Sequence, residues 1–344
     1  MLFLDSETIT NPRCLKARAN LEIKKEFEIP WSVLGADSWY LYDQPTRKLF
    51  RRLEGLWGDL ESLSRRFGTG VQSGADSVLI VDASEAEAQG LESEILRPIL
   101  KGKDVRRYHT SDKTRLLIFP YEVRNDEFVI LTEKLLRQRD VVYKFLLDNK
   151  KRLSRRVWFG KGAKELSGKW YGMMYLDSYK SFTAPHILTP SLSDRSNFTL
   201  GTGDLFATGT AGVTSIIPKS EVHEDIKYIL GILNSSLINF YAISHSPVFS
   251  GGYYKFSAPY LKYIPIRTID FSDSEDEMRH SRMVELVERM LVLQEKLTEA
   301  KILGERTPIQ HQIDATDRQI DRLVYKLYGL SDEEIAIVEE ATSS

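Results

Sequence analysis

Two apolar stripes near the C-terminus constrain the fold of this 344-residue chain more than any other feature. Apolar side chains recur through 283–297, and at three- and four-residue steps over 313–327. This recurrence predicts two amphipathic helices. Gly304 and Thr307-Pro308 predict the break between them, because glycine and proline interrupt helices. The segment should form an antiparallel helical hairpin. The stripes consist of Met283, Val287, Met290, Val292 and Leu297, and of Ile313, Thr316, Ile320, Leu323 and Leu327.

Two further helices are predicted, one at each end of the chain. Gly329 suits a helix C-cap, and Ser331 with Glu334 forms a possible capping box for a last short helix. Near the N-terminus, leucines at three- and four-residue steps predict a helix over Pro45–Arg66, ended by two glycines that follow it. These leucines are Leu49, Leu53, Leu56, Leu60 and Leu63, and the glycines are Gly68 and Gly70.

The middle of the chain mixes both types of secondary structure. Short β-rich runs at 78–81, 116–120 and 186–189 are interspersed with helical stretches at 127–154 and 224–241. Because strands and helices do not alternate regularly, the α+β class is favoured over a doubly wound parallel sheet. We therefore predict a mixed β-sheet and helix domain followed by the helical hairpin. The domains would be 1–37, a lead-in or remnant of an upstream domain, 38–270, the mixed domain, and 271–344, the C-terminal helical region.

Charge is unevenly distributed along the chain, although the formal net charge is only -2. Residues 97–180 hold about 21 lysines and arginines against about 10 acidic residues. From Asp270 onward the balance reverses, with about 18 acidic against about 9 basic residues. A basic middle and an acidic tail are expected when one surface meets phosphates and another faces water or a protein.

The sequence also bears on the compartment. The single cysteine, Cys14, cannot form an internal disulfide, which fits a reducing cytoplasm. The first residues lack the pattern of a secretory signal. The longest apolar stretch, 229–243, is interrupted by polar residues and falls short of the ~20 residues that span a bilayer. We expect a soluble cytoplasmic protein that does not enter the membrane.

Motifs for methyl transfer to DNA are not recognisable. Adenine-specific methyltransferases hold the flipped base with an Asn/Asp-Pro-Pro-aromatic loop and bind the methyl donor at a glycine-containing strand–turn–helix. Asn11-Pro12-Arg13 lacks the second proline and the aromatic residue, and is typical of a turn. The glycine-rich stretch 68–74 follows a predicted helix and precedes a strand, the wrong order for a nucleotide site. We expect no catalytic residues and no cofactor site in this chain.

Metal-dependent chemistry is equally unsupported. A nuclease needs clustered carboxylates and a lysine. The candidates are Glu22 and Lys24 of one Glu-X-Lys triplet, with Asp5 upstream, and Glu-X-Lys triplets are frequent by chance in charged helices. The histidines do not have metal-ligand spacing. We therefore predict no metal site. The histidines are His109, His186, His223, His245, His280 and His311.

Three groups of basic and aromatic residues instead predict nucleic-acid binding. The first basic cluster spans residues 101–108. The second basic cluster spans residues 150–158 and is extended by Lys161, Lys164 and Lys169. The aromatic loop spans 250–255. Lysine and arginine suit phosphate contacts, and arginine and tyrosine can also reach base edges. The alternative is that these residues form surface ion pairs or cover apolar area. The predicted DNA-binding residues are Lys103, Arg106, Arg107 and Tyr108, then Lys151, Arg152, Arg155 and Arg156, then Tyr253, Tyr254 and Lys255.

A set of short motifs in a fixed order resembles a known family. The most specific is Leu-Arg-Pro-Ile-Leu-Lys-Gly-Lys-Asp-Val-Arg-Arg-Tyr at 96–108. Over roughly residues 38–340 the chain resembles the TaqI-like C-terminal specificity domain of type IIG restriction–modification enzymes and related adenine-N6 DNA methyltransferases. Its position 186 is a histidine where the family usually has a basic residue. The other motifs lie at 70–76, 116–121, 158, 170–171, 184–190, 230–236, 261–266 and 313–330.

The resemblance implies a function in DNA target recognition. Residues 38–270 would grip double-stranded DNA and read a short sequence for a methyltransferase that flips an adenine. The catalytic half would be a separately encoded subunit or the missing part of a longer enzyme, and it would bind S-adenosylmethionine. The alternative is a protein–protein scaffolding or regulatory subunit of a defence complex, docking through its acidic helical tail. An associated nuclease is a more distant alternative.

Overall fold

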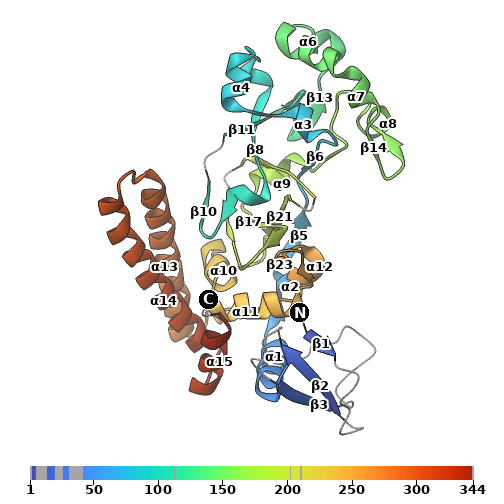
Figure 1. Cartoon of the computed structure of the whole chain (residues 1–344). Helices are drawn as coiled ribbons and strands as arrows, with labels where there is room; N and C mark the ends of the chain where they lie inside the picture. Colours follow the sequence, from blue (N-terminus) through green and yellow to red (C-terminus); the bar gives the residue numbers. More distant parts are fainter. Residues whose placement is uncertain are drawn as a thin grey trace.

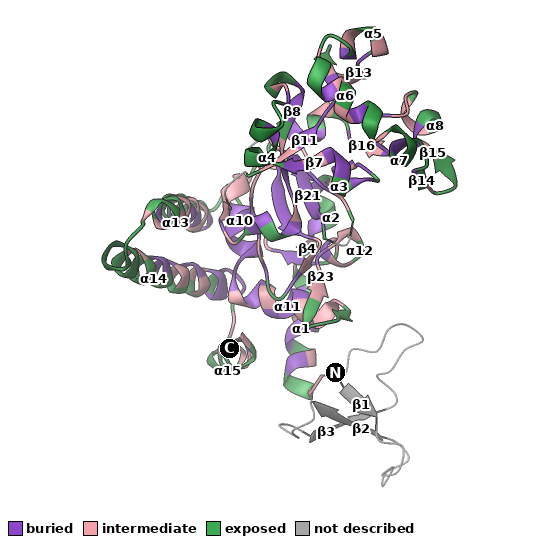
Figure 2. Cartoon of the chain, turned by 45° about the horizontal axis from the view of Figure 1, so that its top comes forward, coloured by how far each residue is buried: buried purple, intermediate pink, exposed green. Residues whose placement is uncertain are grey.

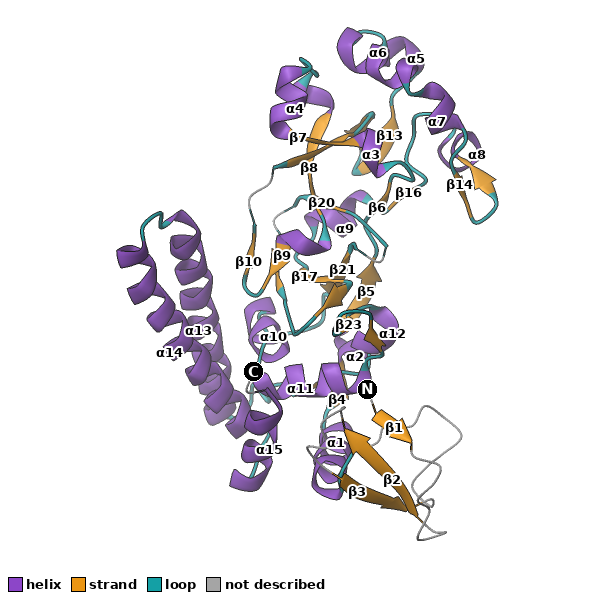
Figure 3. Cartoon of the chain, viewed as in Figure 1, coloured by secondary structure: helices purple, strands orange, loops and turns teal. Residues whose placement is uncertain are grey.

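The computed structural model describes residues 2–4, 14–19, 26–30 and 42–342, apart from 112–113, 202 and 210. Within these residues helices and strands are mixed without regular alternation, which confirms the predicted α+β class (Figure 3). Three sequence features discussed above lie outside the described residues: Asp5, Asn11-Pro12-Arg13, and Glu22 with Lys24.

The C-terminal helices form the predicted hairpin. Helices α13 (Ser274–Glu299) and α14 (Leu303–Leu327) run side by side along one flank of the molecule, and α15 (Asp332–Thr342) follows (Figure 1). The break lies at 300–302, so the prediction that it falls at Gly304 and Pro308 was wrong. Gly304 stands in the first turn of α14, where the backbone amides have no helical partner. Pro308 is the sixth residue and lies inside the helix, which continues although this position lacks an amide to bond the Gly304 carbonyl.

Both predicted caps are present beyond α14. Gly329 has a φ of 59°, the left-handed conformation that ends helices. The Ser331 amide donates to the Glu334 carboxylate at 2.9 Å, and the Glu334 amide donates to Ser331 Oγ at 3.3 Å. This reciprocal pair is a capping box and starts α15.

The N-terminal helix is shorter than predicted. Helix α1 (Gln44–Leu56) ends ten residues before Arg66. Asp59 follows and caps the short helix α2 (Leu60–Leu63), accepting a hydrogen bond from the Ser62 amide at 2.8 Å. The rest of the predicted helix becomes strand β5 (Ser64–Gly68), which pairs with a central strand. Strand pairing therefore overrides the helical pattern of the leucines.

Two four-stranded sheets form the middle of the molecule. The predicted strands at 116–120 and 186–189 are present, whereas 78–81 is divided between helix α3 (Asp76–Leu79) and a strand. One sheet has the order β19 (Thr199–Leu200), β17 (Ile187–Pro190), β21 (Val213–Pro218), β5. The other has the order β20 (Leu205–Phe206), β8 (Leu96–Leu100), β11 (Arg115–Ile118), β7 (Ile80–Asp82).

The two long predicted helical stretches are both divided. The first begins as strand β13 (Glu127–Ile130) and continues as α5 (Glu133–Leu136), α6 (Asp140–Asp148) and α7 (Lys150–Ser154). The second is α10 (Ile226–Leu233) and α11 (Ser236–His245), which meet at 65°. In the described part of the chain no single helix is long and apolar enough to cross a membrane; α10 and α11 would reach that length only as this bent pair.

The remaining elements are short. They are β1 (Leu2–Leu4), β2 (Cys14–Ala19), β3 (Glu26–Pro30), β4 (Gly58–Asp59), β6 (Val71–Gln72), α4 (Ala83–Ala88), the 3-10 turns η2 (Ser93–Ile95) and η3 (Gly102–Asp104), β9 (Val105–Arg106), β10 (His109–Thr110), β12 (Tyr121–Arg124), β14 (Val157–Trp158), β15 (Lys161–Gly162), α8 (Ala163–Ser167), β16 (Tyr175–Leu176), α9 (Tyr179–Thr183), β18 (Leu192–Ser193), β22 (Val248–Phe249), β23 (Tyr253–Lys255), α12 (Ala258–Leu261) and β24 (Pro265–Ile266).

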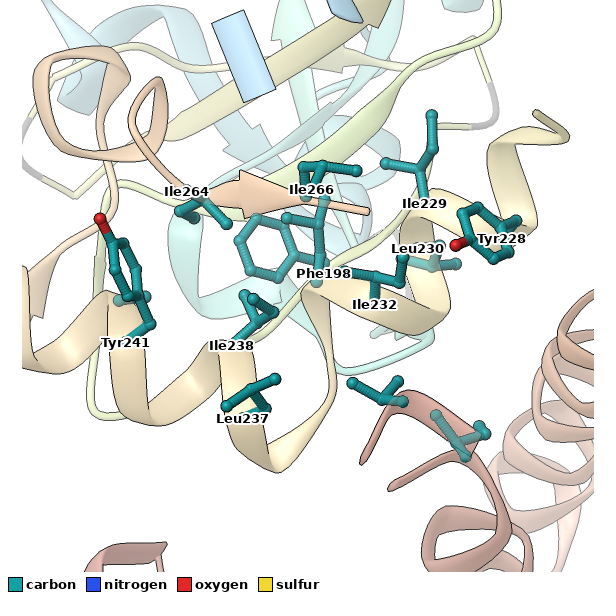
Figure 4. Packing of buried hydrophobic residues seen from close by; sticks show 14 of the residues in the cluster. Phe198, Tyr228, Ile229, Leu230, Ile232, Leu237, Ile238, Tyr241, Ile264 and Ile266 are labelled. Carbon is teal, nitrogen blue, oxygen red and sulfur yellow. The ribbon is translucent and has the colours of Figure 1, made fainter. Parts of the chain in front are cut away.

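The buried residues, purple in Figure 2, form two hydrophobic cores within the described chain. One joins α10 and α11 to α1 and to the C-terminal helices; in it Phe198 packs near Ile264 and Ile266 (Figure 4). The other lies around β7, β8 and β11 and includes side chains of α6 and α7. Because α13 and α14 share the first core with α10 and α11, the hairpin is packed against the mixed domain. The domain boundaries at 37 and 270 stay a prediction.

Candidate nucleic-acid interface

The first basic cluster begins with a tight turn that is held by a glycine and a buried carboxylate. The Gly102 amide donates to the Ala211 carbonyl at 2.9 Å, and a Cβ on Gly102 would come within 2.8 Å of the Gly212 carbonyl. Asp104 is buried, accepts a hydrogen bond from the Lys101 amide at 2.8 Å and forms an ion pair with Arg115 at 2.6 Å. Glycine allows the close approach and the paired carboxylate fixes the turn.

This turn sends the basic side chains in opposite directions. Lys103 and Arg106 are exposed. Arg107 instead forms an ion pair with Asp317 of α14 and donates to the Asn234 carbonyl, with 3.2 Å between Nε and the oxygen. Tyr108 has a φ of 64° and is buried in the first core. Arg107 and Tyr108 thus connect the turn to the helices rather than face solvent.

Lys103 and Arg106 line a cavity of about 670 Å³ together with Tyr253 of the aromatic loop. Two groups of predicted residues that are about 150 positions apart in the sequence therefore meet. Exposed Arg195 lines the same cavity and was not predicted, because the neighbouring residues in the sequence contain no other cation. The remaining wall includes the glycine-containing turns and one carboxylate. It consists of Lys101, Gly102, Pro190, Leu192, Ser193, Asp194, Asn197, Ala211 and Gly212.

The aromatic loop presents its residues unequally. It is built by β22 and β23, and β23 also pairs with β18, which carries cavity residues. The Tyr253 side chain is 47% exposed, whereas Tyr254 is half-buried against the first core. Half-buried Lys255 lines a neighbouring hollow, and its Nζ lies 5.8 Å from the centre of the Phe249 ring. Tyr253 is the member of this loop that lines the cavity.

The second basic cluster lies on α7 and is also divided. Lys151, Arg152 and Arg155 are exposed and line a hollow of about 510 Å³. The Arg156 guanidinium is buried and donates to the carbonyls of Ser73, Leu153 and Trp170 at 2.5, 2.8 and 2.8 Å. Burial lowers the pKa of Arg156 to about 10, so it remains charged at neutral pH. It serves as an internal connector of three segments.

Helix α3 connects the two basic regions. Asp76 forms an ion pair with Lys101 at 2.9 Å, on the cavity side. The next residue, Ser77, accepts a hydrogen bond from Arg152 on the other side. One lining residue of the cavity and one of the α7 hollow are therefore bonded to the same short helix. We call the exposed residues Lys103, Arg106, Arg195, Tyr253, Lys151, Arg152 and Arg155 the basic face.

Among the described residues, no group of three or more His, Cys, Asp or Glu side chains is arranged to hold a metal ion. His186 and His245 are buried or half-buried, and burial lowers the pKa of both. Their rings contact aromatic neighbours, Phe206 and Tyr241 respectively. These histidines are packing residues.

Comparisons with known proteins agree with the motifs. Type II methyltransferase M.PaeR7I of Pseudomonas aeruginosa is 24% identical over 305 residues, covering 87% of this chain and 44% of that protein. Type II restriction enzyme and methyltransferase RM.Eco57I of Escherichia coli is 23% identical over 340 residues, covering 90% of this chain and 33% of that protein. The chain thus spans less than half the length of these curated relatives. Among solved structures, the type IIG restriction endonuclease BpuSI aligns with a TM-score of 0.47 and 14% identity, over 90% of this chain and 37% of that one.

The family match coincides with the cavity. Residues 97–266 match the model of the TaqI-like C-terminal specificity domain. Every residue that lines the cavity, from Lys101 to Tyr253, lies inside this segment. Over residues 97–266 the match confirms the resemblance to this family that the sequence motifs predicted.

Proposed function

We propose that the chain binds double-stranded DNA sequence-specifically through the basic face and serves as the target recognition part of a restriction–modification adenine-N6 methyltransferase. The observation that carries this proposal is the cavity where Lys103, Arg106, Arg195 and Tyr253 converge within the family segment. Arginine can bond to two acceptors of one guanine, so the cavity groups suit base reading. The exposed cations of α7 suit phosphates.

The proposal includes a catalytic partner and a compartment. The named relatives are type II methyltransferases, and the chain spans less than half of each. A methyltransferase domain or subunit that binds S-adenosylmethionine would supply the chemistry, and this chain would hold the duplex against it. We place the assembly in the cytoplasm, where host DNA is methylated and invading phage DNA can be attacked.

Affinity for duplex DNA should fall steeply with salt, and the basic face should account for the slope. Each phosphate contact contributes about 0.9 to the slope of log affinity against log salt. Arg155→Ala should lower the slope by about one and weaken binding about tenfold near 100 mM salt. The measurement is a binding titration with a labelled 30-base-pair duplex at several KCl concentrations.

The control is Arg322→Ala, which removes an exposed arginine from α14, away from the basic face. It should bind like the parent. Absence of duplex binding at low salt would contradict the proposal and favour the protein–protein scaffolding alternative. Equal losses in the Arg155 and Arg322 variants would contradict the assignment of the basic face.

A further inference from the structure

The hairpin of β14 and β15 has an unusual residue at its tip. Its two-residue loop is Phe159-Gly160, with φ values of 47° and 78°. Positive φ at both positions is the pattern of a type I′ turn, which strongly favours Asn-Gly or Asp-Gly. A bulky side chain is strained there, because its Cβ crowds the backbone. The hairpin of β12 and β13 meets the same requirement with Asn125-Asp126, at 50° and 59°.

Phe159 is also the most exposed large hydrophobic residue of the described chain, at 86%. The hairpin projects from the edge of the lobe that carries α6, α7 and α8 (Figure 1). Its anchor is Trp158, whose ring centre lies 5.5 Å from that of Tyr175 in β16. The Tyr175 hydroxyl in turn accepts a hydrogen bond from Arg66 at 3.1 Å. The Phe159 ring contacts that of Trp158, with 4.7 Å between ring centres.

Strain and exposure both act against stability, so folding does not explain this phenylalanine. Backbone strain of this kind costs about 1–3 kcal/mol and persists mainly at functional sites. The surroundings indicate a polyanion. Arg155 lies four residues before Phe159 and lines the α7 hollow, and exposed Lys161 and Lys164 follow it. Glu165 pairs with Lys161 at 3.5 Å, but both side chains are 60% exposed, so the contact is weak.

We propose that Phe159 is an apolar wedge that enters between adjacent base pairs of the bound duplex while the cations beside it hold the phosphates. Phenylalanine serves this purpose in proteins that kink DNA, where a partly opened base step stacks on the ring. The contact of Trp158 with Tyr175 anchors the hairpin beside which the ring would enter the duplex. The wedge rests on the proposed function and adds a local deformation of the DNA. Because flexible base steps deform at lower cost, the wedge would favour them, which is indirect readout of the sequence.

The decisive variant is Phe159→Asn. Asparagine fits positive φ, so the hairpin is retained and unfolding should occur at the same or a higher denaturant concentration than in the parent. The control is Leu303→Asn, which removes a 79% exposed side chain from the start of α14. The probe is a duplex enriched by the parent chain from a random library, with 2-aminopurine placed at each adenine in turn. Its fluorescence rises when a base is unstacked.

The parent should raise the fluorescence several-fold at one step of the duplex. Phe159→Asn should abolish this rise and weaken binding about fivefold or more, the effect of losing one stacked base. Leu303→Asn should match the parent in the fluorescence rise and in affinity. Duplex binding by the parent without any fluorescence rise, or an equal rise with Phe159→Asn, would overturn the wedge and leave the proposed function standing. Failure of the parent to enrich any duplex would overturn both.

Discussion

Replacing Arg156 by alanine is expected to cost about 3–5 kcal/mol of unfolding free energy, whereas the same change at Arg155 should cost less than about 0.5 kcal/mol. The Arg156 guanidinium donates to three carbonyls from three segments in a buried position. Its removal leaves these carbonyls without donors and opens a void beside the second core. Arg155 is exposed, so its removal affects the surface alone.

Urea denaturation of the two variants, followed by circular dichroism, measures this difference. In the DNA titration, with both variants measured below their unfolding transition, Arg155→Ala should have the larger effect. Arg155→Ala should lower the salt slope, and Arg156→Ala should leave the slope of its folded fraction unchanged. Equal stability of the two variants would show that the buried guanidinium is not the connector described above.

Arg107→Ala should be the second most damaging change, at about 2–3 kcal/mol. Its guanidinium joins the turn of the first basic cluster to Asp317 in α14 and to the carbonyl after α10. Both side chains of the ion pair are about one quarter exposed, so we expect a smaller loss of unfolding free energy than for a fully buried pair. The neighbouring Arg106→Ala should leave stability within about 0.5 kcal/mol of the parent.

A double-mutant cycle with Asp317→Asn isolates the ion pair. If Arg107 acts through Asp317, the double variant should be less destabilised than the sum of the two single variants, by about 1–2 kcal/mol. Strictly additive losses would contradict a direct role of this pair in holding the hairpin to the mixed domain.

Periodicity predicted the long elements because it reflects burial of a continuous face. The two stripes over 283–297 and 313–327 predicted the hairpin, and Ser331 with Glu334 predicted the capping box. The exact break was missed, because α14 begins before Pro308 and continues through it, although a proline inside a helix is unfavourable. The helix over 45–66 was overextended for another reason. Pairing of β5 with β21 is a long-range contact that local leucine spacing does not contain.

Charge density identified the residues of the proposed interface only approximately. It identified runs of arginine, but neighbours in a run can point in opposite directions, as Arg155 and Arg156 do. The positive φ of Tyr108 turned the end of the first basic cluster inward. Arg195 was missed because it joins the cavity from a loop without other cations, through the fold rather than the sequence. Phe159 could not be singled out in the sequence either, because the feature that distinguishes it is the positive φ of its turn.

Selection from a random duplex library tests the central claim of target recognition most directly. The full chain is incubated with 30-base-pair duplexes that contain a randomised centre, and bound DNA is sequenced after each round. The parent should enrich one short motif. Arg106→Ala and Arg195→Ala should each relax the choice at individual positions, at a cost of about 1–3 kcal/mol on the parent motif. Arg155→Ala should retain the motif with weaker binding. A failure of the parent to enrich any motif, or a motif unchanged in both cavity variants, would contradict sequence reading by the cavity.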